Sequence, residues 1–123
     1  MAQHNKTGEW GETIAREYLI SKGYAILDTN ARYGKNELDI IAEHADRIVF
    51  VEVKTRSTDE YDPVDAIDMK KIRHLCRGAE SYIISHNIPH QVQFDVVVVI
   101  GTPETNYRIE HYPDAFMPPL SGI

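Results

Sequence analysis

The chain has 123 residues, of which 42% are hydrophobic and 26% are charged, and its formal net charge is -6. This length allows one domain over residues 1–123 and excludes two, and no apolar run approaches the ~20 residues of a membrane-spanning helix. The acidity argues modestly against nucleic-acid binding, although a net charge does not exclude a local basic patch.

The start of the chain is polar and lacks the apolar segment of a signal peptide. The single cysteine, Cys76, excludes an internal disulfide and suits a reducing compartment. We therefore expect a cytoplasmic protein with no membrane partner.

Residues 7–22 are predicted to form a helix, because apolar side chains recur there at helical spacing and Gly23 follows them. Glu12 and Arg16 are spaced for an i,i+4 ion pair on the helix surface. Periodicity alone therefore favours a surface role for Glu12. The apolar stripe consists of Trp10, Ile14, Ala15, Tyr18 and Leu19.

Residues 24–32 are predicted to form a first strand, and residues 37–43 and 47–54 a hairpin. A turn centred on Ala45 and Asp46 would pair His44 with Arg47. One face of this hairpin would then be wholly apolar and buried, which specifies the register strongly. That face consists of Leu38, Ile40, Ala42, Val49, Val51 and Val53.

The other face of the hairpin concentrates charge. The same register places Asp39 opposite Glu52 and Glu37 opposite Lys54. Two carboxylates directly opposite each other repel across ~5 Å, so a divalent cation or Lys54 must offset them. A solvated polar face with an incidental ion pair is the simpler interpretation. It does not explain charges placed within apolar strands, where they are costly unless paired or bound to metal.

Residues 55–63 are predicted to form a loop and residues 64–86 the longest helix. Arg56, in that loop, is placed either to reach a phosphate or simply to be solvated. Lys71 lies at the edge of the helix's apolar stripe, so its amine could extend toward the sheet. A basic face on the same helix fits a solvated surface or nucleic-acid contact; it consists of Lys70, Arg73, His74 and Arg77.

Residues 91–100 are predicted to form a strand buried on both faces, and residues 106–112 an edge strand. Asp95 interrupts the buried strand and requires a hydrogen-bonding or basic partner. The tail, residues 113–123, either docks on the core or a partner, or lacks fixed order. The element order αβββαβ, with a further edge strand, predicts an α/β sandwich in which helices flank a central mixed sheet.

Two segments of the hairpin resemble a known signature. An acid in Glu37-Leu38-Asp39, followed by Val51-Glu52-Val53-Lys54, is similar to the PD-(D/E)xK nuclease motif. More closely, the chain resembles the YraN family of uncharacterised bacterial proteins, which is related to archaeal Holliday-junction resolvases. The resemblance covers residues 8–115 and rests on GETIAREYLISKGY (11–24), NELDIIA (36–42), VFVEVKTR (49–56), Lys71 and FDVV (94–97).

The resemblance implies a restriction-endonuclease-like fold and a catalytic set of Glu12, Asp39, Glu52 and Lys54. Asp39 and Glu52 would bind Mg²⁺ or Mn²⁺, and Glu12 would join the metal site from the first helix. Lys54 would orient a water molecule or stabilise the phosphate in the transition state. Besides this set, Glu37 would support Lys54, and Arg56 and Lys71 would contact nucleic-acid phosphates.

The resulting functional hypothesis is a metal-dependent nuclease that acts on structured or branched DNA, with RNA as a less favoured substrate. Because the related resolvases act as dimers, the resemblance also suggests a homodimer. The alternative is a module that keeps the nuclease fold and binds nucleic acid or protein without cleaving. The acidic net charge favours that alternative, whereas the clustered acids and lysine favour the nuclease.

Overall fold

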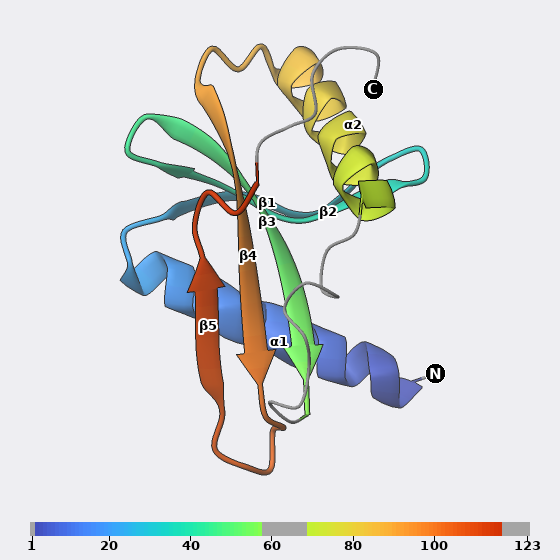
Figure 1. Ribbon diagram of the computed structural model, residues 1–123, viewed down its shortest axis with the longest axis vertical. Helices are drawn as coiled ribbons and strands as arrows, with labels where there is room; N and C mark the ends of the chain where they lie inside the picture. The colour runs from blue at the N-terminus through green and yellow to red at the C-terminus, as the bar shows by residue number, and fades with distance from the viewer. Residues whose placement is uncertain (1, 58–68, 117–123) are drawn as a thin grey trace.

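The computed structural model describes residues 2–57 and 69–116, with side chains from residue 8 onward (Figure 1). The order of elements is the predicted one, including the edge strand at the end. The elements are α1 (Ala2–Ser21), β1 (Ala25–Tyr33), β2 (Asn36–His44), β3 (Arg47–Arg56), α2 (Met69–His86), β4 (Gln91–Ile100) and β5 (Arg108–Tyr112).

The strands form one five-stranded sheet in the described part of the chain, in the order β1-β2-β3-β4-β5. Neighbouring strands are antiparallel except β3 and β4, which are parallel. A parallel pair requires a long crossover, and α2 lies in the segment that supplies it. The predicted α/β class with a central mixed sheet is confirmed, and it is consistent with a restriction-endonuclease-like sandwich.

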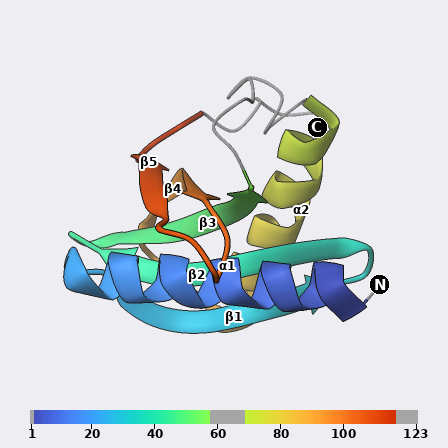
Figure 2. The ribbon, with the colours of Figure 1, turned by 90° about the horizontal axis from the view of Figure 1, so that it is seen from below.

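The two helices lie on opposite sides of β3 and β4 (Figure 2). Alternate residues of β3 therefore enter different cores: Val49 and Val51 pack on the α1 side, whereas Ile48 and Phe50 pack on the α2 side. The α1 side also contains Ala15 and Leu19 of the helix, together with Ile40, Ala42, Val97 and Val99. This burial on both faces explains the nearly continuous apolar runs of the central strands.

Two boundaries differ from the prediction. Helix α1 begins at Ala2, five residues earlier than expected, and strand β3 extends to Arg56. Arg56 pairs with Ile100 of β4 and so belongs to the sheet, not to a loop above it. The predicted loop over residues 58–63 and the helical residues 64–68 lie outside the described residues.

One prediction about the hairpin's faces is wrong. Leu38 was expected beside Ile40 in a single apolar face, but it packs with Ile41 and Phe50 in the cluster on the α2 side. Ile40 packs on the α1 side. The alternation of side chains is therefore broken between these two residues of β2, at Asp39.

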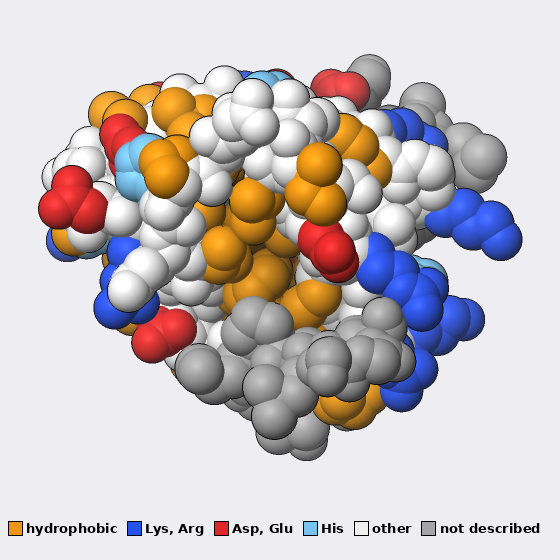
Figure 3. All heavy atoms as spheres, turned by 90° about the horizontal axis from the view of Figure 1, so that it is seen from above, with side chains coloured by type: hydrophobic (Ala, Val, Ile, Leu, Met, Phe, Trp, Pro, Cys, Tyr) orange, Lys and Arg blue, Asp and Glu red, His pale blue; other side chains and the backbone are white. Residues whose placement is uncertain are grey.

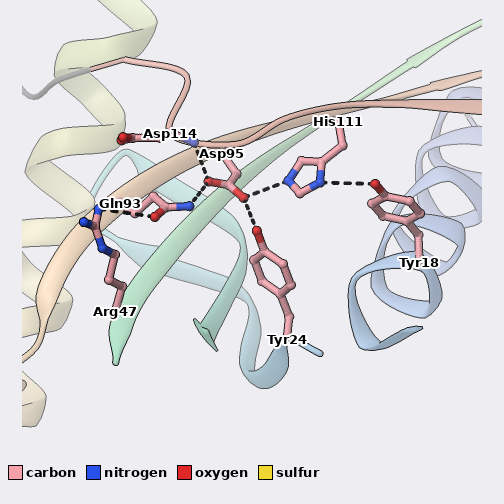
Figure 4. A network of polar contacts seen from close by, with 7 residues as sticks. All are labelled: Tyr18, Tyr24, Arg47, Gln93, Asp95, His111 and Asp114. Carbon is pink, nitrogen blue, oxygen red and sulfur yellow. Dashed lines mark hydrogen bonds and ion pairs between the residues drawn. The ribbon is translucent and has the colours of Figure 1, made fainter. Parts of the chain in front are cut away.

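Asp95, the polar interruption of β4, is fully buried and accepts hydrogen bonds from several elements (Figure 4). Its Oδ2 accepts the Tyr24 hydroxyl and Nε2 of His111, both at 2.8 Å. Its Oδ1 accepts Nε2 of Gln93 at 2.8 Å and the backbone N–H of Asp114 at 3.0 Å. The predicted need for a partner is thus met by residues of β4 and β5, by Tyr24 just before β1 and by the start of the tail.

The network also reaches α1. Nδ1 of His111 lies 3.2 Å from the Tyr18 hydroxyl. If Nε2–H donates to Asp95, neutral His111 accepts the Tyr18 proton at Nδ1. Asp95 therefore connects the edge strand β5 and the middle of the sheet to the helix that carries Glu12.

The first residues of the tail dock on the sheet. Ala115 donates its N–H to the Phe94 carbonyl at 2.7 Å, and the rings of Phe116 and Phe94 stack with centroids 4.9 Å apart. Residues 117–123 lie outside the described residues. Among the described residues, no helix has the length and hydropathy needed to cross a membrane.

We predict that Asp95→Asn destabilises the fold by about 1.5–3 kcal/mol at pH 7, because it weakens charge-assisted hydrogen bonds. Burial alone would raise the pKa of Asp95, but the hydrogen bonds from His111, Asp114, Gln93 and Tyr24 outweigh burial and lower it. A lowered pKa stabilises the fold above the unfolded value of about 3.9, and this stabilisation disappears as the pH falls through the folded value. Urea unfolding at pH 7 and pH 3 measures both effects.

The free energies of unfolding of Asp95→Asn and of the wild type should therefore approach each other at pH 3. Asp114→Asn is the matched control, because only the backbone N–H of that residue contacts Asp95. It should change the free energy of unfolding by less than about 0.5 kcal/mol. An Asp95→Asn variant as stable as the wild type at pH 7 would contradict the role assigned to the network.

Candidate active site

The β2–β3 turn has the predicted register. Ala45 and Asp46 have φ angles of 51° and 66°, which fits the two-residue turn favoured in hairpins. The pairs run from His44 with Arg47 to Ile40 with Val51. The regular β2–β3 pairing ends at Ile40 and does not include the earlier residues of β2. Strand β3 continues beside β4, whereas the β1–β2 hairpin turns away under α2 (Figure 1).

Asp39 lies at the point where β2 leaves β3. Its Oδ2 accepts the backbone N–H of Val53 at 2.9 Å, so a side chain replaces the carbonyl that a regular ladder would supply. On its other side, the β1 ladder pairs Thr29 with Ile40 and Ala31 with Leu38, while Asn30 between them has a φ angle of 52°. Asp39 is thus held at an irregularity shared by both neighbouring strands.

Glu52 is the buried acid of the site, with its side chain only 3% exposed. Its Oε2 forms ion pairs with Nζ of Lys71 at 3.0 Å and with Nζ of Lys54 at 4.0 Å. Lys71 reaches it from α2, which confirms that this amine extends toward the sheet. A buried carboxylate is costly unless it is paired, so these two ammonium groups account for its stability in the fold.

Asp39 and Glu52 lie close enough to affect each other's charge. The pKa of Asp39 is raised to about 8, first by burial and then by its hydrogen-bonded contact with Glu52 and the negative charge there. The Val53 N–H and the Lys71 ammonium oppose the rise without cancelling it. The pair thus carries an electrostatic strain that a cation between the two carboxylates would relieve.

Glu12 lies on α1 near Asp39. Burial raises the pKa of Glu12, and the Asp39 charge raises it further, whereas a hydrogen bond from the Asn30 side chain lowers it. The adjacent Gly11 allows the helix to approach closely, because a Cβ atom there would overlap Oγ1 of Thr55 on β3. Glu12 is thus half-buried near Asp39, and the Arg16 charge also acts on it and lowers its pKa.

Two of the predicted positions need correction. Glu37 does not face Lys54; it pairs with Arg32 of β1, and the two side chains form an ion pair at 3.1 Å on the surface. The reason is that β2 has turned away from β3 by that residue. Arg56 lies on β3 and not in a loop, and its Nη1 donates to the carbonyl of the neighbouring Thr55 at 3.0 Å.

Sequence reasoning missed two supporting residues. Gly11 sits in a helix interior, where glycine is unfavourable, and that cost is a signal for close packing. Asn30 adopts a left-handed backbone, which asparagine tolerates better than most residues. Neither signal identifies the contact partner, because Thr55 and Glu12 meet these residues only in the folded chain.

The donor set suits a hard divalent cation, since Asp39 and Glu52 supply carboxylate oxygens of the kind that Mg²⁺ and Mn²⁺ prefer. Oε2 of Glu52 is buried and receives no hydrogen bond of regular geometry from the described residues, although both ammonium groups are near it. Across residues 2–57 and 69–116, no three His, Cys, Asp or Glu side chains are grouped closely enough to hold an ion. The described residues therefore offer such an ion two carboxylates and not three, with Glu12 near Asp39.

Basic side chains gather on the exposed face of α2. The face seen from above carries lysine and arginine side chains gathered next to an acidic one (Figure 3). Lys70, Arg73 and Arg77 of α2 are exposed. This basic surface of α2 contrasts with the negative net charge of the chain.

Comparison with known proteins gives one consistent result. The model of the uncharacterised protein family UPF0102 matches residues 11–99. A UPF0102 protein of Parabacteroides distasonis is 46% identical over 120 residues, covering 97% of this chain and 98% of its own. Those of Bacteroides thetaiotaomicron and Chlorobium limicola are 44% and 38% identical, over 98% and 89% of this chain and 99% and 90% of their own.

We predict that Asp39→Asn stabilises the metal-free protein increasingly as the pH rises from 5 to 8.5. The folded pKa of Asp39, about 8, exceeds the unfolded value of about 3.9, so the native state holds the extra proton between them. Wild-type stability therefore falls as the pH rises through that window. Asparagine has no proton to lose and can still accept the Val53 N–H. Thermal melts in a chelator should show a Tm gap that widens by at least about 4 °C, the effect of roughly 1 kcal/mol.

Glu37→Gln is the control for this experiment, because it removes an exposed acid from the same strand. Its Tm difference from the wild type should stay within about 2 °C across the same pH range. If the Tm difference between Asp39→Asn and the wild type does not change with pH, the pKa of Asp39 is not raised as described.

We predict that Gly11→Ala destabilises the fold by about 1–3 kcal/mol, since the added methyl group forces α1 or Thr55 to move. Gly8→Ala is the matched control: it lies in the same helix, and a methyl group added there would meet, outside the helix's own backbone, no atom of the described residues within 4 Å. It should stabilise by up to about 1 kcal/mol through helix propensity.

Chemical denaturation of both variants and of Gly11→Ala/Thr55→Ala measures the effect. The double variant should recover most of the lost stability, because the overlapping oxygen is gone. Equal stabilisation by the two alanine substitutions would show that the helix does not depend on this close approach.

Proposed function

The chain belongs to the uncharacterised protein family UPF0102, the YraN-like family that its motifs resemble, and from its site we propose a metal-dependent nuclease. The proposed reaction is hydrolysis of phosphodiester bonds in structured or branched DNA. The observation that carries the proposal is the meeting of Asp39, Glu52 and two lysine ammonium groups where β2 leaves β3. Structured DNA is favoured by the resemblance to Holliday-junction resolvases.

Asp39 and Glu52 are the proposed ligands of Mg²⁺ or Mn²⁺, with Glu12 added directly or through water. When bound, such an ion makes a water molecule acidic enough to attack phosphorus and offsets charge on the phosphate. The chain's contribution is to hold the acids in place. The Val53 N–H binds Oδ2 of Asp39, and Oδ1 would be the oxygen that binds the ion.

Lys54 is the proposed catalytic lysine. It lies on the same strand as Glu52, two residues further on, so the two side chains project from the same face of β3. Its side chain is 24% exposed, which keeps the ammonium accessible to a phosphate while its stem is packed. In this position it would orient the attacking water or donate to a nonbridging phosphate oxygen.

A non-cleaving module for nucleic acid or protein is the second candidate. The observation that favours it is the missing third ligand: Glu12 borders the acid pair, but no three-carboxylate group forms among the described residues. The two candidates differ in a measurable way. A binding module retains affinity for structured DNA and leaves its phosphodiester bonds intact with any divalent cation.

We predict that the purified protein with Mn²⁺ cleaves at least one member of a panel of labelled four-way junctions, flaps, single strands, duplexes and structured RNAs. Lys54→Ala should reduce the rate by about 10²–10³-fold, the effect of removing one preorganised charge-stabilising donor. Asp39→Asn and Glu52→Gln should abolish cleavage. Gel electrophoresis of the products measures all three effects.

Glu37→Gln is the matched control, because this exposed acid pairs with Arg32 and is not one of the proposed ligands. It should cleave at the wild-type rate. If every substrate survives with Mn²⁺ and Mg²⁺, or if Lys54→Ala cleaves as fast as the wild type, the proposed activity is excluded.

A further inference from the structure

The Lys71 ammonium pairs with Glu52, one of the two carboxylates proposed to bind the metal ion. We infer that Lys71 is an internal counter-ion of Glu52, which an incoming divalent cation must displace and which then becomes available to the substrate's phosphate. This inference rests on the proposed function, because it concerns the same metal site. It assigns Lys71 a role in regulating metal affinity, in addition to the phosphate contact expected from the sequence.

The distances support a direct competition. Nζ of Lys71 lies 3.0 Å from Oε2 of Glu52, on a carboxylate whose side chain is 3% exposed. A Mg²⁺ ion lies about 2.1 Å from its ligand oxygens. An ammonium and a divalent ion on the same buried carboxylate would therefore be only a few ångströms apart, and like charges at that separation repel strongly where water is largely excluded.

Lys71 is better placed to leave than Lys54. Lys54 is on β3, whose backbone is paired with Val98 of β4, and its side chain is 24% exposed. Lys71 is the third residue of α2, and its side chain is 41% exposed. Its ammonium can therefore turn toward solvent, or toward a phosphate above the site, without breaking the sheet.

The two lysines thus have different roles at the site. Lys54 stays beside the acids in either state, whereas Lys71 neutralises Glu52 until a metal arrives. This arrangement stabilises the fold without metal and weakens metal binding at the same time. It predicts that removing the Lys71 charge has opposite effects on stability without metal and on metal affinity.

The test is calorimetric titration of Mn²⁺ into the protein without DNA, for wild type, Lys71→Met and Lys70→Met. Lys70 is the exposed neighbour on the same turn of α2, so its substitution removes the same charge without touching Glu52. Lys71→Met should bind Mn²⁺ at least about tenfold more tightly than the wild type, and Lys70→Met within about threefold. In a chelator, Lys71→Met should melt below the wild type, and saturating Mn²⁺ should close that gap.

Lys71→Gln covers the case in which Lys71→Met does not fold, because glutamine keeps a hydrogen-bond donor for Glu52 and lacks the charge. It too should bind Mn²⁺ more tightly. If wild type binds Mn²⁺ and neither variant binds it more tightly, Lys71 only holds Glu52 in place; the counter-ion role is then wrong while the proposed function stands. If neither wild type nor variants bind Mn²⁺ or Mg²⁺, the metal-dependent function fails and the inference with it.

Discussion

The arrangement of the site depends on one hydrogen bond, which the Val53 N–H donates to the Asp39 carboxylate. Two antiparallel strands can separate within a buried sheet only if the groups released from the ladder find other partners. Asp39 supplies that partner at the point of separation. Asp39 lies beside Glu52 there, with Glu12 of α1 near Asp39 and Lys71 of α2 paired with Glu52.

The proximity of the two acids determines the electrostatics of the site. Neither acid is solvated as an ordinary surface carboxylate would be, and the contact with Glu52 adds to the effect of burial on the pKa of Asp39. Lys71 and Lys54 compensate the more deeply buried acid. Burying charged side chains costs desolvation free energy, and side chains with perturbed pKa values are frequent at functional sites. For this reason the buried acids support the nuclease proposal.

The surrounding fold keeps these groups in place through contacts far from them in sequence. The close approach of Gly11 to Thr55 brings α1 against β3. The Asp95 network then links α1, the start of β1, β4 and β5 through Tyr18, Tyr24 and His111 (Figure 4). The position of Glu12 thus depends on packing and on hydrogen bonds that do not involve the acid pair.

The sequence by itself determined the order of the elements, the turn at Ala45 and Asp46, and the strands that carry the acids. These are local properties, since strand alternation, turn residues and apolar runs act over a few neighbouring residues. It also indicated that Asp39 and Glu52 belong together, because the hairpin register follows from the turn.

Only the tertiary structure decided where that register ends. Extrapolating it paired Glu37 with Lys54, whereas the departure of β2 pairs Glu37 with Arg32 and moves Leu38 to the α2 side. It likewise decided that Lys71 binds Glu52 and that Glu12 faces Asp39. These contacts join residues of different elements. Their formation depends on how helices pack against a twisted sheet, which no periodicity within one segment specifies.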